Sequence, residues 1–285
     1  MSRTITIAAV QMDAHPAPTA GRLARADRLA TAAANDGAQL VVLPELFNTG
    51  YAYADANHRL AEPLDGPTPT WMKQAAARLN VHLAGSLMLL DQGQVYNALL
   101  LFAPDVSNPT FHFPNGDALT FDDMGPIMAS MKGTGPLVFG AMIDQQASWL
   151  GVPAVNTVGA GHIRTDIPNG LSSFLTFLPL APWQVRYLSQ AGRMQMSCDV
   201  VQGCKVVDAH GQVLAELAQE QGETFTVAEV TLADERPRPR GPQPSSPVPF
   251  LTYLSSDLLL PWLSIPMYRR GLRRARGNRR AYAQG

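Results

Sequence analysis

The sequence is poor in charged residues, in cysteine and in lysine, and each shortage limits the structures and functions that the chain can have. Charged residues make up 16% of the 285 residues, against about 25% in an ordinary soluble domain. We therefore expect part of the outer surface to be buried against another copy of the chain, in a homo-oligomer. The two cysteines, Cys198 and Cys204, fit neither a disulfide framework nor a C-x-x-C metal or redox site. A reducing cytoplasm is the expected compartment.

Signals for targeting, metals and nucleotides are also missing. The N-terminal stretch MSRTITIAAVQM lacks the long apolar region and small-residue cleavage site of a signal peptide, so we interpret it as a first strand. No glycine-rich phosphate loop follows a strand. The six histidines are scattered without metal-ligand spacing: His15, His58, His82, His112, His162 and His210. The sequence therefore predicts neither a metal nor a cofactor.

Basic charge is concentrated at the C-terminal end. Residues 248–268 are apolar, but they contain Asp257 and several prolines and so predict a poor transmembrane helix. Apolar and basic segments of this kind can lie on an anionic membrane surface. Docking along a partner subunit is the favoured interpretation, because the low charge content already predicts a buried face; nothing favours nucleic acid. Seven arginines follow: Arg269, Arg270, Arg273, Arg274, Arg276, Arg279 and Arg280.

Hydrophobic periodicity predicts alternating strands and helices over the first hundred residues. Asp91-Gln92-Gly93-Gln94 is typical of a hairpin turn. The β-α-β-α-β-β order predicts a sheet covered by helices. The expected strands are 4–12, 40–43, 81–89 and 95–102, and the expected helices are 19–37, capped by Thr19, and Pro67 to Leu79.

Beyond Pro104 the pattern weakens. Residues 105–136 are rich in Pro, Gly, Asn and Asp and predict one long loop, which is unusual inside a compact domain. We divide the chain into a domain over 1–235, irregular or truncated at 105–150, and a C-terminal part over 236–285 made of a Pro-rich linker, the apolar segment and the Arg-rich tail. A helix over 137–150 and strands over 152–158, 200–208, 212–217 and 225–232 are expected.

One carboxylate stands out by its position. Leu40-Val41-Val42-Leu43 is apolar on consecutive residues, which predicts a strand covered on both faces. Pro44 ends that strand, because proline cannot donate to the ladder. Glu45 is thereby placed at the carboxyl end of a central strand, where open α/β sheets hold their ligands. We expect its carboxylate to face the interior.

Several segments carry a resemblance to a known family. ITIAAVQM, LVVLPELFNTGY, LAEPLDGPTPTWMKQAAARLNVHLAGSL and VYNALLLFAPD resemble, in order and spacing, the first half of the nitrilase, or carbon-nitrogen hydrolase, superfamily. WLGVPAVNTVG and GCKVVDAHGQVLAEL are similar to the family's closing segments. The resemblance implies an α/β fold, a four-layer αββα sandwich here with a truncated middle segment, usually paired through a shared helical face.

The resemblance also implies a Glu-Lys-Cys catalytic constellation in which Glu45 matches the general base. A partly desolvated carboxylate can take the thiol proton and later activate water. The thiolate would attack a small non-peptide amide or nitrile, while a lysine ammonium stabilises the developing negative charge.

The lysine does not follow the family pattern. Where the family's lysine ends a strand, this chain offers His112 and Phe113. Of its three lysines, Lys73 falls in a helix and Lys205 in a late strand, and we expect both to be solvated. Lys132 alone lies in the right part of the chain, and it is the doubtful candidate.

The nucleophile departs further. Gly140-Ala141-Met142-Ile143 is the nearest match to the family's cysteine motif, but Asp144 follows it. Cys204 lies in the closing hairpin and Cys198 just before it, and we interpret both as buried small hydrophobes. Two functions stay open: hydrolysis of a carbon–nitrogen bond, or an inactive homologue that serves as a subunit or binding scaffold.

Overall fold

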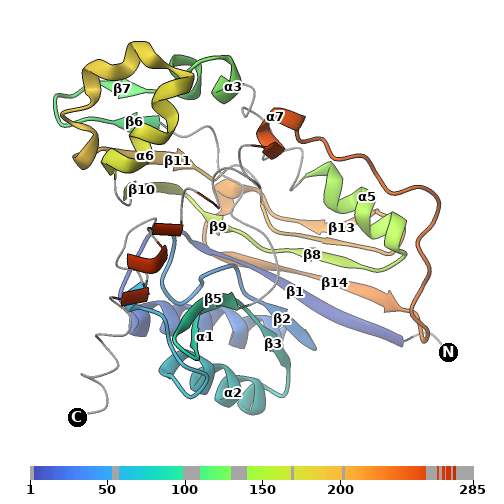
Figure 1. The fold of residues 1–285 in the computed structure, drawn as a ribbon. Helices are drawn as coiled ribbons and strands as arrows, with labels where there is room; N and C mark the ends of the chain where they lie inside the picture. Colours follow the sequence, from blue (N-terminus) through green and yellow to red (C-terminus); the bar gives the residue numbers. More distant parts are fainter. Residues whose placement is uncertain are drawn as a thin grey trace.

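The computed structural model is a set of sheets with helices on the outside (Figure 1). It describes residues 3–52, 58–98, 110–129, 140–167, 170–200 and 203–254, together with 262, 265–266, 268–270 and 272–273.

The first sheet is built around the N-terminal strand. β1 (Arg3–Asp13) pairs antiparallel with β14 (Thr224–Leu232) and parallel with β2 (Leu40–Val42), and β2 pairs parallel with β3 (His82–Ala84). The end of β1 also pairs with β9 (Gly159–Ala160). Val41 packs into one core and its two neighbours pack into another, so β2 is covered on both faces as its apolar run predicts.

Two helices cover the outer face of this sheet. α1 (Thr19–Asn35) turns a stripe of small apolar residues onto β1, and α2 (Pro67–Leu79) packs beside it. Proline at the first position and a left-handed residue at Asn80 explain the two ends of α2. The predicted cap at Thr19 is wrong: Pro18 precedes the first turn, and no side chain caps α1.

A second sheet lies against the opposite face. β12 (Lys205–Val207) is its central strand, between β13 (Val213–Glu216) and β8 (Ala154–Asn156). Side chains of β1, β14, β8 and β12 fill one core between the two sheets. α5 (Ala141–Leu150) packs on β8 and completes the order helix, sheet, sheet, helix (Figure 1). The predicted αββα layering is confirmed.

The prediction of one long loop over 105–136 is wrong, because part of this segment belongs to a third sheet. β6 (Thr110–His112) and β7 (Ala118–Leu119) pair with each other, and β6 pairs with β11 (Gln195–Asp199), which pairs with β10 (His162–Asp166). α6 (Gly170–Phe177) packs over this sheet through Phe174, which contacts Phe113. Short helical segments fill the connections: η2 (Phe121–Met124), α3 (Pro126–Ala129), η3 (Leu178–Leu180), η4 (Pro182–Tyr187), η5 (Ala191–Arg193) and η6 (Gln219–Gln221).

A separate hairpin joins β4 (Leu87–Asp91) to β5 (Gln94–Ala98) through the predicted turn. Gln92 and Gly93 both have positive φ, which the favoured two-residue hairpin turns require. Part of the tail packs on this hairpin: Leu272 is buried against Leu90 and Val95. The remaining named helix, α7 (Phe250–Tyr253), is short, and no helix in the described part of the chain is long and apolar enough to cross a membrane.

Candidate functional site

The turn after β2 carries Glu45 and contains a strained residue, Leu46. The Leu43 N–H still donates to the Ala84 carbonyl, so the turn begins where the sheet ends. Leu46 then adopts a φ of 49°, and its carbonyl accepts the N–H groups of Thr49 and Gly50. The Ser86 hydroxyl accepts the Leu46 N–H at 3.0 Å. Glu45 therefore projects from a tight turn that is fastened to the next strand connection.

The Glu45 carboxyl is largely withdrawn from water. Burial raises the pKa of Glu45 to about 7, while hydrogen bonding from the Asn97 amide and, more weakly, from the Tyr51 hydroxyl holds it lower than burial alone would. The Asn97 amide donates to Oε1. Oε2 is buried, and no donor among the described residues meets the full geometry of a hydrogen bond to it. The shielding agrees with the position that the sequence predicts, and the role of general base stays a prediction.

A second acid, which sequence reasoning missed, ties this turn to α2. The Glu62 carboxylate accepts the Thr68 N–H at 2.6 Å, the Thr68 hydroxyl at 2.7 Å and the Asn48 amide at 3.3 Å. Asn48 and Thr68 are both fully buried. Because Thr68 lies in the first turn of α2, Glu62 also interacts favourably with the positive end of the helix. The acid a few residues before Pro67 was the signal available in the sequence.

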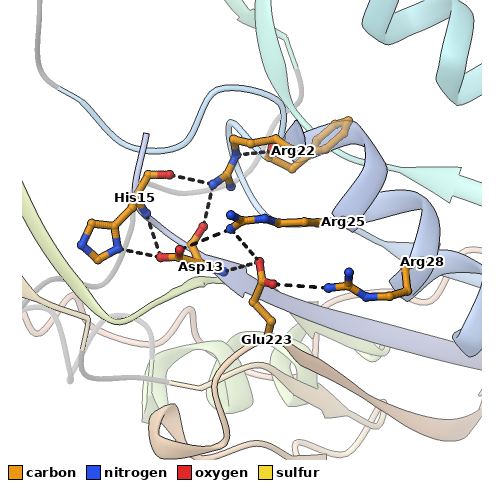
Figure 2. A network of polar contacts seen from close by, with 7 residues as sticks. Asp13, His15, Arg22, Arg25, Arg28 and Glu223 are labelled. Atoms are coloured by element: carbon orange, nitrogen blue, oxygen red, sulfur yellow. Dashed lines mark hydrogen bonds and ion pairs between the residues drawn. The ribbon is translucent and has the colours of Figure 1, made fainter. Parts of the chain in front are cut away.

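A polar network fastens the other side of the turn (Figure 2). The Arg22 guanidinium, fully buried, donates to the backbone carbonyls of Asp13, His15 and Phe47. The Asp13 carboxylate contacts His15 at 2.7 Å and Arg25 at 3.3 Å. Sequence reasoning missed Arg22, although an arginine on the same stripe as Ala26 and Ala30 was visible.

The lysines are not brought to Glu45 in the described structure. Lys73 is exposed on α2, as predicted. Lys132 lies outside the described residues. The predicted solvation of Lys205 is wrong: its side chain is 4% exposed, because it lies in the central strand of the second sheet under α5. Its ammonium donates to the Gly140 carbonyl at 2.9 Å and forms an ion pair with Asp144.

Asp144 is therefore engaged in holding α5 on the second sheet. It also lines an open hollow, together with Trp149, His210 and Arg240. This hollow lies between α5, the turn at the end of β12 and the segment around residues 240–244. An aspartate paired with an ammonium in this way is a poor nucleophile, because the pairing stabilises its charge.

Both cysteines are buried in the core between the sheets. Burial raises the pKa of Cys204 to about 12, and the Cys204 thiol donates to the Val10 carbonyl at 3.3 Å. Burial and the Asp199 charge raise the pKa of Cys198 to about 11. Glu45 is not among the groups that shift either thiol. The geometry agrees with the interpretation of both residues as small buried hydrophobes.

Two histidines make polar contacts on the third sheet. The His112 ring lies 2.7 Å from the Ser197 hydroxyl, and the His162 ring lies 2.7 Å from Asp199. Burial and the nearby charges of Arg164 and His162 lower the pKa of His112. Within the described ranges, no three His, Cys, Asp or Glu side chains are grouped as metal ligands would be.

The assembled site can bind and exchange a proton near neutral pH. A carboxyl with a pKa of about 7 is an acid and a base in comparable amounts at that pH. An amide donor and a phenol stand beside it. Among the described residues, neither a thiol nor an ammonium joins them. As far as the described residues form it, this half-site supports proton transfer and hydrogen bonding but presents no thiol for covalent attack.

Comparison with known proteins shows what the first part of the chain is similar to. Residues 6–110 match the carbon-nitrogen hydrolase family model. The match confirms that this part of the chain resembles the nitrilase, or carbon-nitrogen hydrolase, superfamily. The matched segment contains Glu45 and Asn97 and ends where β6 begins.

Among its relatives, a nitrilase of Pyrococcus abyssi is 30% identical over 103 residues, which cover 35% of this chain and 39% of that protein. An omega-amidase NIT2 of Danio rerio is 36% identical over 87 residues, 30% of this chain and 31% of that protein. The chain thus spans about a third of the length of the curated relatives it matches. The solved structure of Nit3 from Saccharomyces cerevisiae is 18% identical, covers 80% of this chain and 90% of its own, and has a TM-score of 0.49.

Proposed function

We propose that this chain is a carbon-nitrogen hydrolase homologue that keeps the acid–base carboxyl but does not turn over amides or nitriles through a cysteine, and that it acts as a subunit or binding scaffold. One observation carries the proposal: Glu45 is shielded and has a pKa of about 7, whereas both thiols are enclosed in the core between the sheets.

The thiol chemistry explains why that observation matters. The thiolate, not the thiol, is the nucleophile. With a pKa of about 12, Cys204 would be ionised at pH 7 to roughly one part in 10⁵. Burial also keeps a substrate carbon from reaching either sulfur. Loss of the nucleophile costs on the order of 10⁶ in rate in another hydrolase, and a general base alone contributes only about 10²–10⁴.

Among the described residues, no lysine is free to stabilise a developing negative charge at Glu45 either. Lys205 would be the buried ammonium, but its ion pair with Asp144 and its bond to the Gly140 carbonyl use its charge to hold α5. The cost of breaking such a buried pair is about 3–5 kcal/mol, so Lys205 is not available to a substrate.

The test is an activity panel with matched variants. Aliphatic amides, aromatic amides and nitriles are offered to the wild type, to Cys198→Ser and to Cys204→Ser, and intact mass is followed for an acyl adduct. We expect no turnover above the Glu45→Gln control and no adduct. Turnover that is lost in one cysteine variant, with an adduct on that cysteine, would overturn the proposal.

A second candidate is hydrolysis of a small carbon–nitrogen bond, and the pKa of Glu45 favours it, because a general base is most effective when its pKa is near the working pH. In that case turnover would depend on pH with an inflection near 7 and would be abolished by Glu45→Gln. Turnover unaffected by both cysteine substitutions but abolished by Glu45→Gln would support this candidate with a different nucleophile.

The scaffold role makes a separate prediction. The low charge content favours a face buried against a second copy. Native mass spectrometry of the full chain is therefore expected to show an oligomer, and a strictly monomeric chain at micromolar concentration would argue against the subunit role. The tail carries exposed Phe250 and Trp262; flotation with anionic liposomes that is lost on truncation after residue 247 would favour membrane contact instead.

A further inference from the structure

The Glu45 turn is held in a conformation that its own sequence disfavours. Leu46 has a φ of 49°, in the left-handed region that residues with a Cβ seldom occupy. Such a residue costs on the order of 1–3 kcal/mol and persists only where its surroundings over-determine it. Something outside the turn must therefore hold residues 45–47 in place.

Three contacts could do so. The Ser86 hydroxyl fixes the Leu46 N–H at 3.0 Å, and the buried Phe47 ring packs 5.7 Å from the Trp71 ring. The third contact is the Arg22 Nε, which donates to the Phe47 carbonyl at 2.7 Å. It is a charge-assisted bond, and such bonds are roughly twice as strong as neutral ones.

Arg22 also fixes the neighbouring segment that the turn leans on. Its Nη1 donates to the carbonyls of Asp13 and His15, each at 2.8 Å (Figure 2). The same segment receives the Tyr51 N–H on the Ala14 carbonyl. One guanidinium therefore joins α1, the end of β1 and the Glu45 turn.

The form of this contact is unusual for a helix residue whose task is only to cover a sheet. Arg22 is 1% exposed, and burial lowers its pKa, an effect that the Asp13 charge opposes. Its hydrogen bonds in the described structure go to neutral carbonyls, while the Asp13 carboxylate bonds to His15 and Arg25. An alanine would cover β1 at no desolvation cost, as Ala26 and Ala30 do.

We propose that Arg22 is the positioning residue of Glu45: by clamping the Phe47 carbonyl to the backbone of residues 13–15, it holds the Glu45 carboxyl in its shielded place. Glu45 is shielded because the turn keeps it against Tyr51 and Asn97. Without the clamp, Leu46 can relax to an ordinary φ, and the carboxyl gains access to water. The inference concerns the position of Glu45 and stands whether or not the chain turns over a substrate.

The experiment measures the acid dissociation of Glu45 directly. The side-chain carboxyl carbons of ¹³C-glutamate-labelled protein are titrated by NMR, and the Glu45 resonance is assigned by its loss in Glu45→Gln. In Arg22→Met we expect the acid dissociation constant to rise at least roughly tenfold, which moves the pKa from about 7 toward its ordinary value. Arg22→Lys keeps the charge but loses the planar guanidinium that donates to several carbonyls at once, so a smaller rise of the acid dissociation constant is expected.

Two further variants separate positioning from general stabilisation. Arg28 lies on the same helix and contacts only Glu223 in the network, so Arg28→Met should leave the Glu45 titration unchanged. Leu46→Gly removes the cost of the left-handed φ. The double variant Arg22→Met/Leu46→Gly should therefore recover at least part of the raised pKa of Glu45, although it recovers no contact of the guanidinium.

The outcome decides the proposal in each case. A folded Arg22→Met or Arg22→Lys protein whose Glu45 still titrates near 7 would overturn it, and so would a shifted titration that Leu46→Gly does not restore. If Arg22→Met does not fold, the Arg22→Lys protein alone and combined with Leu46→Gly gives the same decision. The amide and nitrile panel is scored separately, so failure of the proposed function leaves this result intact.

Discussion

The Glu45 turn and the Asp144 ion pair both withdraw a carboxylate from water, but they differ in what stands opposite. Glu45 meets an amide and a phenol, both neutral, so burial raises its pKa to about 7. Asp144 meets the ammonium of Lys205, which is itself buried. An unpaired carboxyl in a poorly solvated place becomes a proton-exchanging group, whereas a paired one becomes a fastening between elements. The same carboxylate group therefore has two roles, depending on whether a neutral donor or an ammonium lies beside it.

The largest effect on stability is expected when the ammonium of Lys205 is removed. Lys205→Met is expected to lower the free energy of unfolding by about 3 kcal/mol, because it leaves Asp144 and the Gly140 carbonyl without their donor. Urea unfolding measures it. The double variant Lys205→Met/Asp144→Asn should lose clearly less than the two single variants added together. Additive losses would mean that the pair is not a coupled unit.

The next test concerns Glu45 and pH. Because its pKa in the folded chain lies above the unfolded value, folded protein binds the proton more tightly, and the resulting stability is present below pH 4.5 and lost as pH rises through 7. Above pH 7, the free energy of unfolding of Glu45→Gln should therefore exceed that of the wild type by about 1–3 kcal/mol. This range is reduced to allow for the carboxyl's remaining exposure to solvent. The difference should vanish near pH 4. Equal pH profiles for the two proteins would place the carboxyl in water.

A smaller effect is expected from the amide beside Glu45. Asn97→Ala removes a donor that favours the charged form, so the pKa of Glu45 should rise further above 7. Carboxyl ¹³C titration gives the value. A fall would show that Asn97 acts mainly by excluding water.

The smallest effect is expected from Tyr51→Phe. The phenol also holds the pKa of Glu45 down, but less than Asn97 does, so its removal should raise that pKa by less than Asn97→Ala. The same titration ranks the two variants. The reverse order would make Tyr51 the principal hydrogen-bond donor.

The sequence predicted the elements whose signals are local. α2 runs from Pro67 to Leu79 as predicted, because proline starts the helix and a left-handed residue ends it. The β4–β5 hairpin follows from a turn that needs positive φ at two positions. Further along, α5 and β8 agree with the helix expected over 137–150 and the strand expected over 152–158, but the strands of the third sheet were missed. β6, β10 and β11 are strands of three to five residues whose partners lie far away in sequence, so too few residues carry a pattern.

In the candidate site, the position of Glu45 could be predicted from local signals in the sequence. Pro44 after an apolar run fixes where β2 ends, and that alone places Glu45 at the edge of the sheet. The burial of Lys205 could not be predicted, because a strand residue flanked by Cys204 and Val206 can face either side, and only the position of α5 decides which is covered. The sequence also indicated that Cys198 and Cys204 are small buried hydrophobes, and the core between the sheets contains both.

The sequence by itself determined most helices and strands of the first hundred residues, and that a carboxylate follows β2, because backbone preferences act between near neighbours. The single strand expected over 81–89 is an exception: it is divided into β3 and β4, which lie in different sheets. Only the tertiary structure decided what that carboxylate is. Burial and the neutral partner Asn97, 52 residues away from Glu45, come from segments that only packing brings together, and so does Arg22, which is 25 residues away from Phe47. A pKa depends on the distance to every nearby charge and to water, and those distances do not exist until the chain is packed.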